Sequence, residues 1–437
     1  MTPSPARVPA PGGVRRLSTV LCAYAFCDDF VLLYPVYALL FSDAGLSLGQ
    51  ISSLFVLWSV TGVALEVPSG AWADAVSRRR LLWLGPLLTA AGFALWVLVP
   101  SYPAFALGFV LWGAGGALGS GALEALAHDE LERLGAADRY ARVMGRVRAV
   151  GPAATAASMA LAGPVFAWGG YQAVGAASVL ACLLASATAA RLPEHHEPSA
   201  RGTGAGWTAS LRAGLAGARA DRSVRGALLL VPAVTAVWGA LDEYTPLLVR
   251  DTGVAEATVP WLLLVVWSGA TAGGLLAGVG ERRLGTTGLA ALLTGAAGAL
   301  AVGALIGGPA GIVLIGLAFG GFQLATVIAD ARLQRRIDAT GRATLTSVAG
   351  LGTELGTVAV YGAYAATASA AGHGGAFAWA AVPYLLTAGV LAATVRRKRQ
   401  PPREEGAQRI AVNRPSDATN RSPARNACSL SRRERRP

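Results

Sequence analysis

The chain is 437 residues long, and 54% of them are hydrophobic while only 14% are charged. Because about one residue in four is charged in a soluble globular domain, this composition indicates an integral membrane protein. The net charge of +12 comes mainly from the segment after residue 395, which holds 13 Lys/Arg and 4 Asp/Glu. A basic tail beside a membrane fixes orientation or contacts anionic lipid, so we expect a lipid bilayer and no nucleic acid as partner.

Twelve apolar runs are long enough to cross a bilayer, which takes about 20 residues each. In chain order they are 17–41, 48–73, 81–99, 103–127, 147–168, 171–190, 226–249, 259–280, 286–306, 309–329, 344–366 and 375–395. The first run is too long for a signal peptide and carries two aspartates, so we expect it to be a retained helix.

The positions of Lys and Arg orient these spans. With a cytoplasmic N-terminus, 36 of the 37 Lys and Arg residues lie in cytoplasmic segments and only Arg250 lies outside. Such an asymmetry follows the positive-inside rule. We therefore expect a multi-pass protein of the cell (plasma or inner) membrane with both termini in the cytoplasm.

A long polar segment divides the spans into two groups of six. The expected parts are a cytoplasmic N-terminus 1–16, an N-terminal half 17–190, a central cytoplasmic loop 191–225, a C-terminal half 226–395, and a basic tail 396–437 with too few apolar residues to fold. The halves echo each other, since Leu57-Trp58-Ser59 matches Val266-Trp267-Ser268, and Asp28-Asp29-Phe30 matches Asp242-Glu243-Tyr244. Two related halves with the substrate site between them are typical of transporters.

Glycine pairs with small-xxx-small spacing predict close helix packing in the C-terminal half. The pairs are Gly269 and Gly273, Gly274 and Gly278, and Gly316 and Gly320. Because this spacing lets two backbones approach within one bundle, it does not require a dimer, and we expect a monomer.

The segment between the second and third spans carries a charged motif. Gly70 is followed by Asp74 and then by Arg78, Arg79 and Arg80. The Pro-Ser-Gly run that ends at Gly70 predicts a break in the second helix, because glycine permits a tight turn. Asp74 can hold the arginines or a helix N-terminus, which makes a charge relay that forms in one conformation and opens in another.

This motif resembles the signature that the major facilitator superfamily carries in the same loop. Three further runs, Glu66 to Gly70, Ser120 to Ala125 and Tyr140 to Arg146, resemble a multidrug-efflux-like subgroup. The resemblance covers residues 17 to 395. It implies an all-α integral membrane protein of twelve transmembrane helices in two six-helix halves, with the loop as a cytoplasmic gate. One departure is that the fourth span lacks the arginine that drug–proton antiporters of the family often carry.

Acidic residues in or near the spans are the candidates for proton or substrate coupling, because an ionisable group at membrane depth is costly and marks function. They are Asp28, Asp29, Glu354, Asp242, Glu243, Glu66 and Glu124. At about 1.5 Å per helical residue, Asp28 and Glu354 are expected near the bilayer midplane, either in coupling or as buried structural acids. Glu66 and Glu124 lie near cytoplasmic ends, where an acid can instead reach water, cap a helix or pair with loop arginines.

These residues predict the substrate class. Acids without a deep Lys or Arg favour a cationic or neutral hydrophobic small molecule, which can compete with protons for the same carboxyl group. Aromatic residues in the spans can stack on such compounds, although packing is an alternative; they are Trp58, Trp112, Trp238, Trp267, Tyr34 and Tyr37. The first expectation is therefore proton-coupled export of such molecules by alternating access.

Two other functions stay open, namely proton-coupled import of a small nutrient and a membrane sensor without transport. No span contains Asn, which counts against sugar uptake. The four histidines lie in loops or at span ends and the four cysteines show no CxxC spacing, so we expect no enzyme activity, no metal and no cofactor. The sequence also lacks a phosphate-binding loop for ATP.

Overall fold

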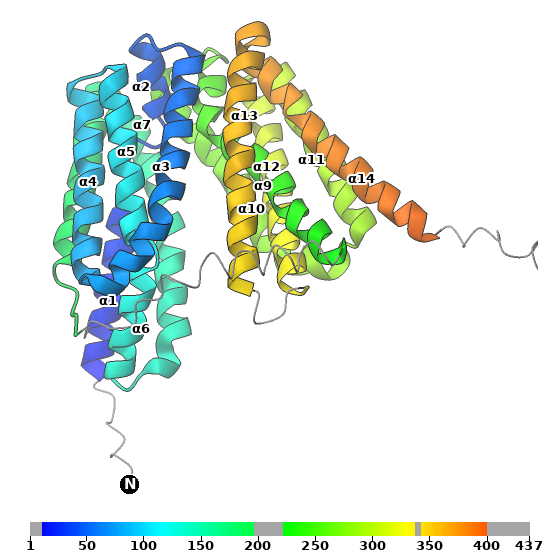
Figure 1. Cartoon of the computed structure of the whole chain (residues 1–437). Coiled ribbons are helices and arrows are strands. Elements are labelled where there is room, and N and C mark those ends of the chain that lie inside the picture. Colours follow the sequence, from blue (N-terminus) through cyan, green and yellow to red (C-terminus); the bar gives the residue numbers. More distant parts are fainter. Residues whose placement is uncertain (1–10, 196–221, 337–341, 400–437) are drawn as a thin grey trace, which may run out of the picture. The chain divides into compact units, whose positions relative to one another are not determined.

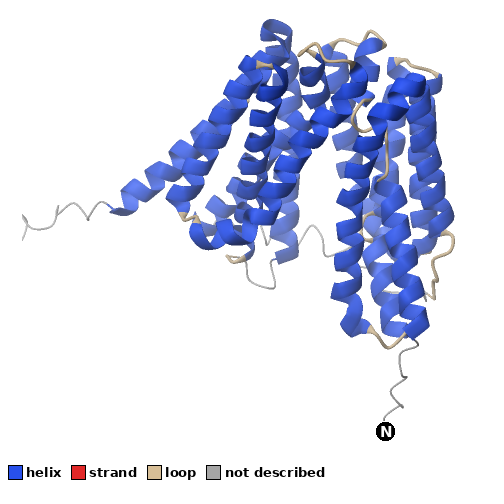
Figure 2. Cartoon of the chain, turned by 180° about the vertical axis from the view of Figure 1, so that it is seen from behind, coloured by secondary structure: helices blue, strands red, loops and turns tan. Residues whose placement is uncertain are grey.

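The computed structural model describes residues 11–195, 222–336 and 342–399, with the side chains of 66–75 and of a few residues at segment ends left out. All regular elements in these ranges are helices (Figure 1, Figure 2). The α-helices are α1 (Pro11–Asp29), α2 (Tyr37–Asp43), α3 (Leu48–Ala75), α4 (Arg78–Leu98), α5 (Tyr102–Gly119), α6 (Ala122–Arg133), α7 (Tyr140–Ala189), α9 (Arg222–Arg250), α10 (Val259–Arg283), α11 (Thr286–Ile306), α12 (Gly308–Gln334), α13 (Arg342–Trp379) and α14 (Ala381–Arg399); two short 3₁₀ helices are η1 (Ala137–Arg139) and η2 (Glu256–Thr258). Residues 1–10, most of the central loop and the tail beyond Arg399 lie outside the described residues.

Within the described residues, nine helical segments are long and apolar enough to cross a membrane. Two of them, Ala137–Ala189 and Leu345–Arg397, are 53 residues long, and each takes in two of the predicted runs. Both contain glycines with a positive φ, 59° at Gly170 and 71° at Gly372. Since only glycine adopts this backbone conformation at no steric cost, these residues mark the turn between consecutive spans.

The prediction of one continuous first helix over 17–41 is wrong. α1 ends at Asp29, turns follow, and α2 begins at Tyr37. Pro35 lies in this break, and a proline disfavours helical backbone in the residue before it. The backbone N–H of Leu33 donates to the buried hydroxyl of Ser178 on α7, at 3.0 Å. Irregular backbone at membrane depth is tolerated where protein groups satisfy it in this way.

Two further helix boundaries also differ from the prediction. The expected break at Pro68-Ser69-Gly70 is wrong, because α3 continues through it to Ala75; membrane helices accommodate proline when neighbouring groups satisfy the freed carbonyls. The helix after it, α4, starts behind Ser77, whose hydroxyl accepts the N–H of Arg80 at 3.2 Å. The fourth run, expected over 103–127, is divided at Gly121, where φ is 72°.

The glycine pairs explain how closely α10 and α12 approach. A Cβ atom on Gly273 would collide with the carbonyl oxygen of Gly320, and one on Gly269 with that of Gly316. Gly278, in contrast, has no atom within 4 Å of its Cβ position. Two of the three predicted pairs therefore form one tight interface, as small residues do between membrane helices.

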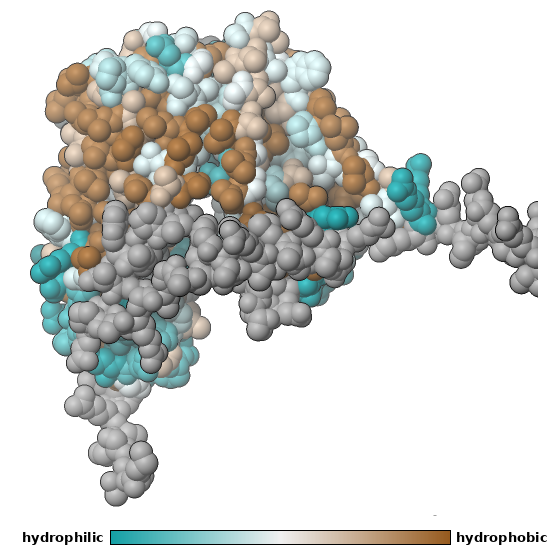
Figure 3. Space-filling view, viewed as in Figure 1, coloured by the Kyte–Doolittle hydropathy of each residue, from teal (hydrophilic) through white to brown (hydrophobic). Residues whose placement is uncertain are grey.

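The chain forms a compact unit over residues 1–393 and a second unit from 394 onward, which is described only as far as 399. A continuous apolar core in the first unit contains residues of both six-span groups, among them Phe41, Phe55, Tyr244 and Phe319. On the face seen in Figure 3, apolar side chains gather in a band over the helices, while hydrophilic ones collect toward the end that carries α6. This band is the surface expected to face lipid.

Candidate functional site

The two halves are joined by polar contacts at one end of the bundle, the predicted outer end. The Arg250 guanidinium at the end of α9 bonds to the Asp43 carboxylate and to the Ser42 hydroxyl at the end of α2, each at 2.6 Å. Tyr171 donates a second hydrogen bond to Asp43. We name the four residues Arg250, Asp43, Ser42 and Tyr171 the outer latch.

Just below the outer latch the halves pack through aromatic rings. The hydroxyl groups of Ser52 on α3 and Tyr244 on α9 are 2.6 Å apart and buried. Phe55 lies 5.3 Å from the Tyr244 ring and 5.5 Å from the Tyr361 ring, between ring centroids. This layer closes the space between the halves at the outer end.

The opposite, predicted cytoplasmic end is arranged differently. In the described ranges, the ion pairs and side-chain hydrogen bonds there stay within one half, for example Arg78 with Asp129 and Arg335 with Glu281. Among the described residues, the polar side-chain contacts that join the two halves lie at the outer end.

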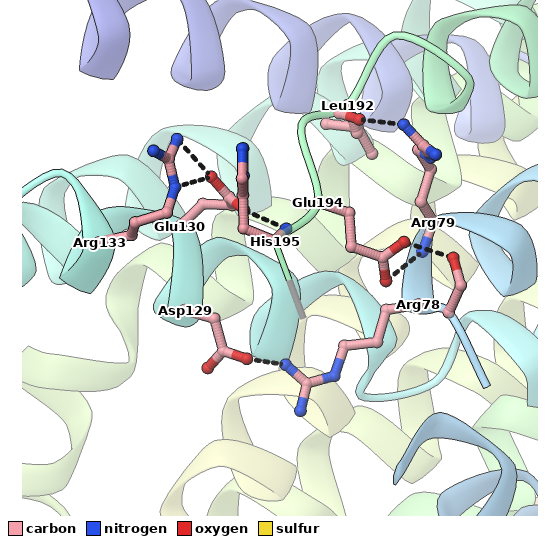
Figure 4. Close-up of polar contacts among 9 residues, drawn as sticks. Arg78, Arg79, Asp129, Glu130, Arg133, Leu192, Glu194 and His195 are labelled. Atoms are coloured by element: carbon pink, nitrogen blue, oxygen red, sulfur yellow. Dashed lines mark hydrogen bonds and ion pairs between the residues drawn. The ribbon is translucent and has the colours of Figure 1, made fainter. Parts of the chain in front are cut away.

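The arginines of the loop motif take part in one of these networks (Figure 4). Arg78 pairs with Asp129 on α6, and the backbone N–H of Arg79 donates to Glu194, whose carboxylate also accepts the Ser77 hydroxyl. Arg80 is exposed, and its backbone N–H donates to the Ser77 hydroxyl. The network fixes the start of α4 to the beginning of the central loop.

A second set of contacts in Figure 4 holds the buried Glu130 of α6. Its carboxylate accepts from Arg133 at 2.9 Å and from the backbone N–H of His195 at 2.9 Å. A charge with so little exposure needs such partners, because an unpaired buried carboxylate is costly. Gly70, Asp74 and Glu66 belong to the stretch 66–75, of which only the backbone is described. The charge relay expected around Asp74 therefore stays a prediction.

Between the two halves lies a cavity of about 550 Å³, which we name the central cavity. Four helices supply most of its walls: α3, α9 and α13 from their middle, and α5 from its C-terminal part. α3 and α5 belong to the N-terminal half, and α9 and α13 to the C-terminal half. The lining residues are Trp58, Ser59, Gly62, Val63, Trp112, Gly113, Gly116, Ala117, Ser120, Thr235, Gly239, Glu243, Thr353, Glu354, Thr357 and Tyr361.

Charge and aromatic surface lie on opposite walls of the central cavity. Glu243 and Glu354 come from the C-terminal half, and both are close enough to Tyr361 to interact with it electrostatically. Trp58 and Trp112 come from the N-terminal half and stack with ring centroids 4.8 Å apart. Among the described residues that line it, none is Lys or Arg. Such a site suits a cation, which carboxylates attract and which indole faces stabilise.

The two predicted acids of the first span lie outside the central cavity. Asp28 and Asp29 end α1, immediately before its break, and neither lines the central cavity. Asp28 is near Cys182 of α7, and its side chain is exposed. The Asp29 carboxylate packs against Gly151 on α7. Within the described residues, neither aspartate forms an ion pair.

Glu124 is in the first turn of α6, and its carboxylate lies 3.6 Å from Arg148. Both side chains are substantially exposed, so this pair contributes little to stability. The expected alternative is a pair with a loop arginine, whereas Arg148 lies in the third turn of α7.

Sequence reasoning missed the hydroxyl groups of the central cavity. Thr353, Thr357 and Tyr361 follow each other at four-residue spacing on α13, which places them on one helical face together with Glu354. A helical-wheel projection of the sequence around Glu354 shows these hydroxyl groups on the same face as the carboxylate. The first-half hydroxyl groups lack a comparable pattern, because Ser59 lies on α3 and Ser120 lies in the turn after α5.

Comparison with known proteins agrees with this architecture. The sequence matches the family model of the Major Facilitator Superfamily over residues 19–358. No curated protein matches it. A solved structure of a variant of the nucleoside transporter NupG has a TM-score of 0.71 with 12% identity, over 87% of this chain and 99% of that chain.

Two other solved structures are similar to the chain. The POT family transporter PepTSo has a TM-score of 0.65 with 15% identity, over 88% of this chain and 99% of its own. A D-xylose–proton symporter has a TM-score of 0.63 with 14% identity, over 86% and 96%. At such low identities these likenesses show the fold.

Proposed function

The chain belongs to the major facilitator superfamily, and we propose that it is a proton-coupled transporter that exports cationic or neutral hydrophobic small molecules. The observation that carries this proposal is the composition of the central cavity. Glu243 and Glu354 face Trp58 and Trp112 across it, and no basic residue is among the described residues that line it. An anionic substrate would meet only repulsion there, whereas a hydrophobic cation meets both favourable groups.

The distribution of these groups over the two halves supports alternating access. A cation that contacts an indole face of the N-terminal half and a carboxylate of the C-terminal half links the two walls. Its binding therefore favours conformations in which the walls are close. Substrate can shift a conformational equilibrium only through such differential contacts.

Proton coupling follows from the same carboxyl groups. Each of Glu243 and Glu354 can hold either a proton or the positive charge of a substrate, because both compete for the same lone pairs. Protons that enter from the outer side would displace the cation, and release of those protons inside would restore the site. The energy then comes from the proton gradient.

The experiment is uptake of tetraphenylphosphonium into everted membrane vesicles under an imposed pH gradient. We expect gradient-dependent uptake by the wild type and its loss in Glu354→Gln, which keeps the shape of the side chain. Glu256→Gln, on the short helix η2 outside the cavity, is the matched control and should transport normally. Equal uptake with and without the gradient would contradict the proposal.

Proton-coupled import of a small hydroxylated nutrient is the second candidate, and one observation favours it. The central cavity carries five Ser and Thr hydroxyl groups, from Ser59, Ser120, Thr235, Thr353 and Thr357. Such groups can bond to substrate hydroxyls. Gradient-driven accumulation of a sugar or nucleoside in whole cells, with no uptake of tetraphenylphosphonium in everted vesicles, would favour this function over export.

A further inference from the structure

A second cavity of about 580 Å³ lies beside the central one, between the first part of α7 and α10. We name it the side cavity. Its remaining walls come from α9 and α12. The lining residues are Pro152, Ala156, Met159, Trp238, Asp242, Leu264, Trp267, Ser268, Ala270, Thr271, Ala272, Gly274, Leu275, Phe319 and Gln323. None of them lines the central cavity.

The two cavities receive neighbouring acids from one helix. Glu243 lines the central cavity, and Asp242 lines the side cavity. Consecutive residues of an α-helix point about 100° apart, so α9 directs one carboxylate into each space. In the part of the chain that the structure describes, Asp242 is the only charged residue lining the side cavity, and it is within hydrogen-bonding reach of Trp267.

Both cavities contain the same chemical groups. The central cavity joins Glu243 with Trp58, Ser59 and Trp112. The side cavity joins Asp242 with Trp267, Ser268 and Trp238. Trp58-Ser59 and Trp267-Ser268 are equivalent positions of the two sequence repeats. Each of the two spaces thus pairs a carboxylate of α9 with two indole rings.

We propose that the side cavity is a second binding site for a lipophilic cation, separate from the central cavity. The class of ligand rests on the proposed function, whereas the existence of the site rests on the side cavity's own residues. Asp242 neutralises the charge of the ligand, and Trp238, Trp267 and Phe319 contact its apolar rings. Trp267 also holds the Asp242 carboxylate toward the cavity.

The wall of the side cavity connects it with the lipid-facing surface. Leu275, which lines the cavity, is 81% exposed, and its neighbour Leu276 is 56% exposed. On the other side, Pro152 and Ala156 of α7 are exposed as well. A hydrophobic cation dissolved in the bilayer therefore meets the side cavity at an apolar rim.

The test counts binding sites on the purified full-length protein by equilibrium dialysis with radiolabelled tetraphenylphosphonium. Two matched plugs separate the cavities. Ala156→Phe fills the side cavity, and Gly116→Phe fills the central one, where the glycine has no atom within 4 Å of its Cβ position. We expect two sites in the wild type, one in each plug variant and none in the double variant.

A charge variant gives the same test without a change in volume. Asp242→Asn should weaken one of the two sites at least tenfold and leave the other unchanged, while Glu243→Gln should have the reverse effect. Asp242→Asn is close to isosteric, so it reports on binding even where a plug disturbs folding.

The outcomes separate this inference from the proposed function. A single site that Gly116→Phe removes and that Ala156→Phe and Asp242→Asn leave unchanged would overturn the side cavity and keep the central one. A single site with the opposite response would support the side cavity and overturn the proposed function. No binding at all would overturn both.

Discussion

Breaking the outer latch should make the protein open to the outside more often. In Arg250→Gln the side chain loses its charge, and with it the ion pair to Asp43 and the geometry of its bond to Ser42. These contacts join the two halves at the outer end and exist only when that end is closed. Their loss therefore destabilises the closed arrangement relative to one in which the halves separate there.

The size of the effect follows from exposure. The side chains of Arg250 and Asp43 are 27% and 37% exposed, so solvent screens the pair, and exposed ion pairs contribute about 0.2–1 kcal/mol. The hydrogen bond from the guanidinium to Ser42 adds roughly 1 kcal/mol, less than the usual range for a charged donor because it too is partly solvated. The total of about 1–2 kcal/mol corresponds to a shift of roughly 5- to 30-fold in the equilibrium.

The assay uses a cysteine beneath the latch. Ser52 is only 4% exposed and lies against Tyr244, so Ser52→Cys, in a background without the native cysteines, reacts with an impermeant maleimide only while the outer end is open. We expect Arg250→Gln to raise the labelling rate by roughly 5- to 30-fold. Arg250→Lys keeps the charge and should have a smaller effect. An unchanged rate in Arg250→Gln would refute the role of the latch.

Three further predictions concern packing, pH and the first span. Gly273→Ala should lower the thermal unfolding temperature of the purified protein strongly, because overpacking costs about 1–3 kcal/mol or more, whereas Gly278→Ala, in open space, should leave it nearly unchanged. Burial lowers the pKa of His373, so the folded state favours the neutral ring. The stability that the neutral ring contributes is present above a pH of about 6.5, the pKa of an unfolded histidine, and is lost as the pH falls below that value. The difference in unfolding temperature between the wild type and His373→Gln should therefore shrink as the pH is lowered from about 7.5 to about 5.5. Asp28→Asn should abolish gradient-driven uptake while leaving equilibrium binding of tetraphenylphosphonium within about twofold, since Asp28 lies outside both cavities; loss of binding would contradict its placement.

The membrane helices were predictable because hydropathy over about 20 residues follows directly from bilayer thickness. The family was likewise predictable from the motif that starts at Gly70. The breaks within helices were harder to predict, because the prolines of two spans have opposite effects on the helix. Pro35 lies where the first span is interrupted, but α3 passes through Pro68 without interruption. Which outcome occurs depends on tertiary partners, such as the Ser178 hydroxyl that satisfies Leu33.

The candidate site could be predicted only in part. Acids in spans are conspicuous, so Glu243 and Glu354 were identifiable, but the residue pattern alone does not distinguish the two members of an adjacent pair such as Asp242 and Glu243. The separation of Asp242 from Glu243 into two cavities depends on how α9 is rotated in the bundle. The outer latch depends on residues 207 positions apart, Asp43 and Arg250, and no local pattern connects them.

The measurement that tests the central claim most directly is proton release on ligand binding. Tetraphenylphosphonium is added to purified protein in weakly buffered solution, and the pH change is followed. If the cation and the proton compete for Glu243 and Glu354, binding should release protons from the wild type and none from the double variant Glu243→Gln/Glu354→Gln. Binding without proton release, or equal release from the double variant, would contradict the account.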